Sequence, residues 1–210
     1  MKNSGVTPGT IIILNGPSGA GKSTIQKAVQ DTFEELYLCV GIDKFFDEAL
    51  PDLDDKGVSL VGGADVRRVV CQEGPLGPEV KLEVGPVGMR AIRGMHRAFA
   101  AYAAQGNNLV VDYIAYHNEW LPDLAQALAG FRVYLVGVTL PLEVLAERER
   151  VRCKTSIEHA RSHYHQVHEG ITHDLVIDTS QLNPTEAAEY IRRYMQDNPE
   201  PNALALIVSK

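Results

Sequence analysis

The segment from residue 16 to residue 24 combines glycines, a lysine and hydroxyl side chains in an order that suits phosphate binding. Its nine residues are Gly16, Pro17, Ser18, Gly19, Ala20, Gly21, Lys22, Ser23 and Thr24. They match GxxxxGK[ST] between an apolar run and a helical pattern, where glycines let backbone N–H groups converge on phosphate oxygens. A glycine turn without a ligand is the alternative, but the flanking pattern favours ATP binding. We expect Lys22 to reach the β- and γ-phosphates and the Ser23 hydroxyl to ligate Mg²⁺.

Two aspartates end apolar runs elsewhere in the chain. Asp112 follows Leu109–Val111, and Asp43 follows Val40-Gly41-Ile42. In a doubly wound sheet ligands lie beyond the carboxyl ends of the strands. We therefore expect Asp112 to hold Mg²⁺, directly or through water, and Asp43 to accept the proton of an incoming hydroxyl from the strand next to the phosphate-binding strand. The alternatives are a strand-end cap for Asp112 and a helix N-cap for Asp43.

Two arginines share one face of a predicted helix. Arg148 and Arg152 are four residues apart, whereas Arg150 points elsewhere. Two guanidinium groups on one face suit a lid that closes over phosphates, and together with Lys22 they would stabilise charge during phosphoryl transfer. A solvated charged face, paired to neighbouring glutamates, is the alternative.

A dense group of histidines follows these arginines. It comprises His159, His163, His165, His168 and His173. Although His159 and His163 have helical i,i+4 spacing, no cysteine or HExxH motif accompanies them, so we interpret them as part of a polar helix face and not as a metal site.

Apolar strands alternate with amphipathic helices along the chain. The predicted strands are Thr10–Leu14, Leu36–Ile42, Leu109–Val111, Arg132–Thr139 and Leu175–Ile177. The predicted helices are Lys22–Phe33, Lys44–Leu50, Val87–Ala104, Glu119–Ala129, Leu142–Arg152, Ile157–His168 and Pro184–Met195. This alternation predicts an α/β protein with a three-layer P-loop NTPase fold: a mostly parallel sheet, helices on both faces and a lid.

We expect residues 1–210 to form a single domain with three special segments. Residues 52–86 are rich in Gly, Asp and Pro, with brief alternating stretches at 58–61 and 80–84, and read as an excursion, with a small hairpin, that covers the substrate. Residues 148–168 would form the lid region. The tail, 198–210, reads either as an edge strand or as a frayed end.

Composition narrows the class of partner. A formal net charge of −7 argues against nucleic acid as the main ligand, because duplex binding needs many Lys and Arg contacts. The three cysteines are widely spaced, which suits reduced thiols, and the apolar run near the N-terminus is too short for a leader or a membrane span. We expect a cytoplasmic protein with a small-molecule hydroxyl substrate and no membrane partner; the sequence carries no signal for an oligomeric state.

Several segments together resemble the chloramphenicol phosphotransferase family, in order from about residue 10 to 195. They are Ile11–Ser23, Gly41-Ile42-Asp43, Gly85-Pro86, Leu109–Asp112, Arg148 with Arg152, Val167-His168-Glu169-Gly170 and Val176–Ser180. The resemblance implies phosphorylation of the primary hydroxyl of chloramphenicol with ATP and Mg²⁺, and a base at Asp43. It also implies phosphate and metal contacts at Lys22 and Ser23, a lid with Arg148 and Arg152, and a nucleotide base near Asp178, Thr179 and Ser180.

Two departures from the family pattern leave the acceptor open. Tyr113 follows Asp112 where the family pattern has a second aspartate, and Cys153-Lys154-Thr155 replaces a Gly-Asp-Arg after the lid arginine. Kinases of other small alcohols, such as shikimate, gluconate and adenylylsulfate kinases, share the layout. A nucleotide-binding module without turnover is the alternative outside the enzymes.

Overall fold

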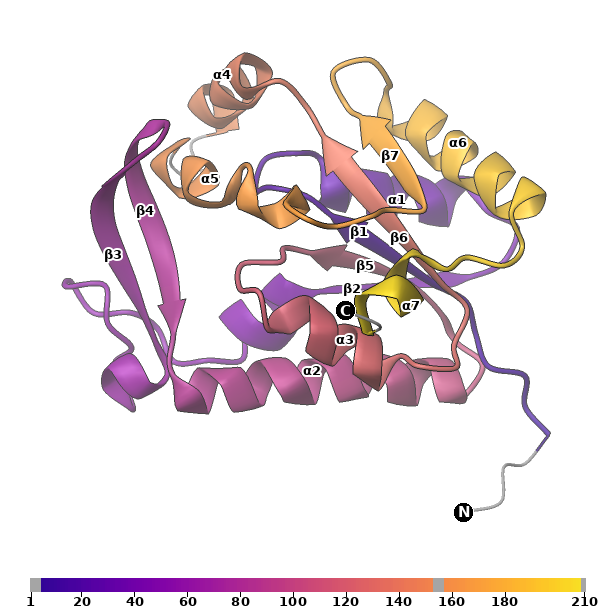
Figure 1. The fold of residues 1–210 in the computed structure, drawn as a ribbon, viewed down its shortest axis with the longest axis horizontal. Helices are drawn as coiled ribbons and strands as arrows, with labels where there is room; N and C mark the ends of the chain where they lie inside the picture. The colour runs from indigo at the N-terminus through magenta and orange to yellow at the C-terminus, as the bar shows by residue number, and fades with distance from the viewer. Residues whose placement is uncertain (1–4, 153–156, 209–210) are drawn as a thin grey trace.

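A five-stranded parallel sheet forms the centre of the molecule, in the order β2-β5-β1-β6-β7 (Figure 1). Its strands are β1 (Ile11–Asn15), β2 (Tyr37–Gly41), β5 (Asn108–Tyr113), β6 (Val133–Thr139) and β7 (Leu175–Asp178). The computed structural model describes residues 5–152 and 157–208; Cys153-Lys154-Thr155 and the side chain of Arg152 lie outside the described residues.

Helices cover both faces of this sheet. They are α1 (Lys22–Thr32), α2 (Pro86–Ala104), α3 (Trp120–Ala127), α4 (Leu142–Arg152), α5 (Ile157–His163), α6 (Pro184–Asp197) and α7 (Ala203–Val208). Alternate residues of β1 point to opposite faces: Ile11 packs in one core with Phe99 of α2, and Ile12 in a second core with Ile25 of α1. Two cores on one sheet make three layers, so the predicted fold class is confirmed, and the strands are apolar throughout because both faces are buried.

A β-hairpin projects beyond the sheet within residues 52–86. β3 (Arg67–Gly74) and β4 (Gly77–Val84) pair antiparallel, and α5 packs against β4 (Figure 1). The alternating stretch at 80–84 belongs to β4, but the one at 58–61 makes only isolated bridges. Sequence reasoning missed β3 because the charged residues around Val69 and Val70 hide its alternation.

The described residues also contain three short helical turns, two of which lie where longer helices were predicted. They are the π-helical turn η1 (Asp43–Asp47) and the 3₁₀ turns η2 (Gly63–Asp65) and η3 (Gln166–His168). The helix predicted over 44–50 is thus a single turn, and the one predicted over 157–168 ends at His163. The tail forms α7 instead of a strand or a frayed end, because burying Ala203 and Leu204 against α3 stabilises a helix there.

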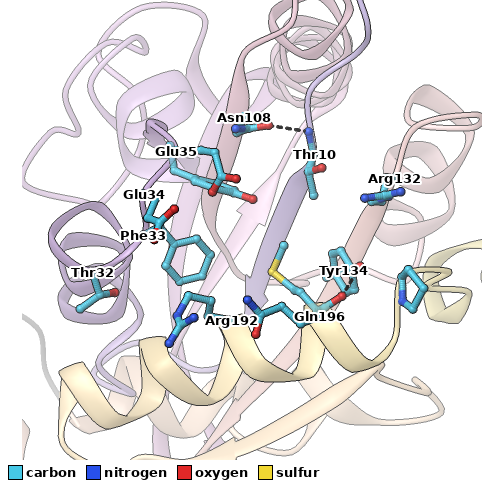
Figure 2. Close-up of a pocket in the computed structure, with 13 residues that line it drawn as sticks. Thr10, Thr32, Phe33, Glu34, Glu35, Asn108, Arg132, Tyr134, Arg192 and Gln196 are labelled. Atoms are coloured by element: carbon cyan, nitrogen blue, oxygen red, sulfur yellow. Dashed lines mark hydrogen bonds between the residues drawn. The ribbon is translucent and has the colours of Figure 1, made fainter.

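A cavity of about 710 Å³ lies at the amino ends of the strands (Figure 2). Thr10, Asn108 and Arg132 line it from the strand side, and Arg192 and Gln196 from α6. Among the helices of the described residues, none is long and apolar enough to cross a membrane.

Candidate active site

The turn between β1 and α1 is shaped by glycines in the left-handed region. Gly19 has φ 78° and Gly21 has φ 92°, a conformation that costs other residues about 1–2 kcal/mol. Gly21 caps α1, so the first N–H groups of that helix have no carbonyl one turn back within it. They face the space beyond β1, with the partial positive charge of the helix behind them. The turn therefore has the geometry of an anion site.

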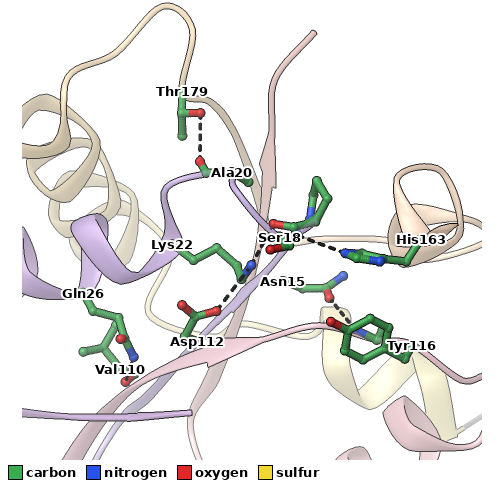
Figure 3. A network of polar contacts seen from close by, with 12 residues as sticks. Asn15, Ser18, Ala20, Lys22, Gln26, Val110, Asp112, Tyr116, His163 and Thr179 are labelled. Carbon is green, nitrogen blue, oxygen red and sulfur yellow. Dashed lines mark hydrogen bonds and ion pairs between the residues drawn. The ribbon is translucent and has the colours of Figure 1, made fainter. Parts of the chain in front are cut away.

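Lys22 places a cation inside this turn. Its side chain is buried, and Nζ donates to the Pro17 carbonyl at 2.8 Å and lies 3.4 Å from Asp112 Oδ1 (Figure 3). Strand pairing produces this approach, because Leu14 of β1 lies beside Asp112 of β5. Ser23 and Thr24 are exposed at the start of α1. The structure thus brings the predicted phosphate and metal residues to one point, at the carboxyl edge of the sheet.

Asp43 reaches the same edge from β2, although by a different route from the predicted one. We expected its strand to lie next to β1, but β5 lies between them. The prediction of adjacency was wrong, because a later part of the chain supplies the strand beside β1. Gly41 pairs with Asp112, so Asp43 begins η1 two residues beyond that pair and is exposed.

Tyr116 lies among these carboxylates. Burial, followed by the negative charges of Asp47, Asp43 and Asp112, raises the pKa of Tyr116 well above its usual value. Its hydroxyl is 2.9 Å from His159 Nε2. An un-ionised phenol therefore stands where the carboxyl ends of β2 and β5 meet, beside Asp43 and Asp112, a position that sequence reasoning missed.

A second, smaller cavity of about 240 Å³ borders the glycine turn. Gly19, Gly21 and Arg148 line it together with apolar residues of α1 and α6. Arg148 donates to Thr179 twice, at 2.9 Å to Oγ1 and at 2.7 Å to the carbonyl oxygen, and Thr179 Oγ1 donates to Ala20 O at 2.9 Å. Arg148 and Thr179 therefore hold one wall of a pocket that opens on the turn.

Comparison with known proteins identifies the family. The sequence profile described as Chloramphenicol phosphotransferase-like protein matches residues 9–196. The chain belongs to this family. The resemblance noted from its motifs is thereby confirmed.

This chain has a curated relative in Mycobacterium tuberculosis, and its fold is similar to those of several solved structures. A Mycobacterium tuberculosis (strain H37Rv) protein, provisionally named O-phosphotransferase Rv2636, is 28% identical over 208 residues, covering 95% of this chain and 88% of its own. The fold is similar to that of M. tuberculosis APS kinase in complex with AMPPNP and APS, with TM-score 0.59, 16% identity and coverage of 90% and 98%. Acinetobacter baumannii shikimate kinase in complex with shikimate gives TM-score 0.54, 16% identity and coverage of 91% and 94%.

Other residues that the family resemblance singled out have local roles. Asp178 Oδ1 accepts the N–H of Ser180 at 2.8 Å, which stabilises the turn after β7. The side chain of Arg152 lies outside the described residues, so its place relative to Arg148 stays a prediction.

Asn15 was missed as a site residue, and the interpretation of His163 as part of a polar helix face was wrong, because its side chain is buried. Asn15 is fully buried at the end of β1, where Nδ2 donates to Val167 O at 2.5 Å and Oδ1 accepts the Ala115 N–H at 3.2 Å. It ties η3 and the loop after β5 to the carboxyl edge of the sheet. The position directly before Gly16 was the available signal, because a buried amide ending an apolar strand needs partners.

Proposed function

We propose that this chain transfers the γ-phosphoryl group of ATP to a hydroxyl of a small molecule. The observation that carries the proposal is the convergence of Lys22 and Asp112 at a glycine turn before a helix, with Asp43 just beyond the end of the strand beside that of Asp112. The donor phosphates would meet the turn, and the acceptor would approach from the side of Asp43. Membership of a phosphotransferase-like family supports this assignment.

The acceptor step needs a group that orients a hydroxyl and takes its proton. As the hydroxyl oxygen bonds to the γ-phosphorus, the bond from phosphorus to the ADP oxygen breaks and the hydroxyl proton passes to the Asp43 carboxylate. Asp43 is exposed, so an incoming alcohol can reach it. Since the transition state of phosphoryl transfer is loose, Asp43 would act largely by orientation.

Charge stabilisation falls to Lys22 and the N–H groups at the start of α1. Both are preorganised: the ammonium is buried beside Asp112, and the helix fixes the direction of the amides. In the described part of the chain, no group of three or more His, Cys, Asp or Glu side chains could hold a metal by itself. Asp112 and Ser23 fit Mg²⁺ as partial ligands, because this ion usually combines one or two protein groups with phosphates and water. When bound, Mg²⁺ would neutralise phosphate charge.

The cavity beside Arg148 and Thr179 suits the nucleoside. Its apolar residues Ile25, Leu182 and Pro184 offer a surface for a planar base, and it opens on Gly19 and Gly21. Arg148 would lie near both the base and the phosphates, as in a lid. Residues 148–168 are proposed to serve as that lid, and residues 52–86 to cover the acceptor.

The family description makes chloramphenicol or a related amphenicol the first acceptor to test. Small alcohols of the kind that shikimate and gluconate kinases use are the second group. Incubation with Mg-ATP and a panel containing both groups, with product detection by mass, distinguishes them. Absence of chloramphenicol phosphate at high enzyme concentration would exclude the amphenicol assignment.

Asp43→Asn tests the reaction itself. We expect phosphotransfer to fall by about 10²-fold or more, while the Kd for Mg-ATP stays within about twofold, because the amide cannot take a proton but keeps the shape of the side chain. Asp31→Asn is the control, since Asp31 only pairs with Lys27 on the exposed face of α1. If neither the wild type nor the variants phosphorylate any alcohol, the chain is a nucleotide-binding module.

A further inference from the structure

A histidine of α5 hydrogen-bonds to the backbone of the glycine turn. The N–H of Ser18 donates to His163 Nε2 at 3.0 Å, and the His163 side chain is 1% exposed (Figure 3). Ser18 and His163 are 145 residues apart in the chain. None of the roles proposed above uses this contact.

The neighbouring hydrogen bonds decide which nitrogen of His163 carries the proton. Ser162 Oγ donates to the His159 carbonyl at 2.8 Å, because a carbonyl can only accept. With its proton used, Ser162 Oγ accepts from His163 Nδ1 at 3.2 Å. His163 Nε2 is then left with a lone pair, which is what the Ser18 N–H requires.

His163 stays neutral in this position. Burial, followed by the nearby His159 and Lys22, lowers the pKa of His163 well below its usual value. The ring also packs edge-on against Tyr116, with centroids 4.7 Å apart. Neutrality keeps Nε2 an acceptor, since a protonated ring would present a donor to the Ser18 N–H.

The same helix, α5, also hydrogen-bonds to the β3–β4 hairpin and to the loop after β5. His159 Nδ1 donates to Val80 O of β4 at 3.2 Å, so His159 Nε2 accepts from the Tyr116 hydroxyl. One turn of α5 therefore contacts the hairpin, the loop that carries Tyr116 and the glycine turn. Its side chains fix these three parts relative to one another.

We propose that His163 is a positioning residue for the phosphate-binding turn, an inference that rests on the proposed function. Gly19 and Gly21 make the turn intrinsically flexible, because glycine has the widest choice of backbone conformations. His163 fixes Ser18 before these glycines, and Thr179 fixes Ala20 between them. The turn then meets the phosphates with its N–H groups already directed, so less conformational entropy is lost on binding.

Two amide substitutions at one position test the contact. The side-chain amide of His163→Gln lies where Nε2 lies in histidine, so its oxygen can accept from Ser18; that of His163→Asn lies where Nδ1 lies and reaches only toward Ser162. We expect the Kd for Mg-ATP to rise about tenfold in His163→Asn, the equivalent of one lost hydrogen bond, and to stay within about twofold in His163→Gln. His165→Asn is the control, because His165 is exposed and its ring contacts Tyr164.

Adenosine separates positioning from a general loss of structure. Because it has no phosphates, its Kd should be the same in wild type and both His163 variants, measured by calorimetry well below their unfolding temperatures. Equal Mg-ATP affinity in His163→Asn and wild type, or equal losses for ATP and adenosine, would overturn the inference. A wild type that binds no Mg-ATP would instead defeat the proposed function, so the two failures are distinguishable.

Discussion

The amino and carboxyl ends of the central sheet differ in their cavities and in the charged groups that surround them. The amino end has a cavity of about 710 Å³, but its arginines come from separate elements, and Arg192 is paired with Glu189 on its own helix. At the carboxyl end, a cavity of about 240 Å³ lies beside a buried lysine, a strand-end aspartate and the N-terminus of α1. We assign the proposed site by converging chemistry and not by cavity volume, because parallel strands direct helix N-termini and loops toward the carboxyl end.

Lys22→Met should have the largest effect, because it removes the buried cation beside Asp112 and keeps most of the length of the side chain. We expect kcat for phosphotransfer to fall by about 10²–10³-fold, the usual cost of losing one preorganised charge-stabilising group. Steady-state kinetics with saturating acceptor measures it. Activity within threefold of wild type would mean that Lys22 has no role in catalysis. The main chemical difference between the two ends of the sheet would then carry no functional meaning.

Acid should destabilise the protein through one buried histidine, His163, and three half-buried ones. Burial lowers the pKa of His159, His163, His168 and His173, the last to about 4. The unfolded chain takes up protons near pH 6.5 and the folded chain only at lower pH, so stability is complete above about pH 6.5 and declines as the pH falls toward 4. At pH 5, the lowered pKa of His173 alone would reduce the free energy of unfolding by on the order of 2 kcal/mol.

Thermal unfolding at pH 7.5 and at pH 5.0, followed by circular dichroism, measures this loss. His173→Asn should lose less stability than wild type between the two pH values, because the amide does not titrate. The ring of His173 packs on Gly137, where a Cβ would come within 3.0 Å of it, so comparison is made within each variant and not between them. Equal losses in both proteins would contradict the assignment.

Arg132→Gln should have the smallest effect, because it removes charge from the amino end only. We expect kcat/KM for ATP to change by less than about twofold, since surface substitutions away from the site are usually nearly neutral. Measuring kcat/KM for ATP in Arg132→Gln and Lys22→Met in parallel compares the effect of losing one positive charge at each end of the sheet. A tenfold change would mean that the large cavity communicates with the glycine turn.

The sequence by itself determined the fold class and the glycine turn between β1 and α1. The alternation of strands and helices could be predicted because the order of apolar residues within each element shows which of its side chains are buried. The two faces of β1 are an example. The turn was readable because nine consecutive residues make it, and glycine conformation and the start of a helix are local properties. The hairpin was only partly readable, since the charged residues of β3 mask its alternation.

Only the tertiary structure decided which distant residues meet at that turn. Strand order places β5 between β1 and β2, which sets Asp112 beside Lys22 and Asp43 one strand further away, against the prediction. Packing of α5 on β4 brings His163 to Ser18, which no spacing in the sequence reveals. The physical reason is that strand order and helix docking are set by burial summed over the whole chain, whereas motifs record only what neighbouring residues require.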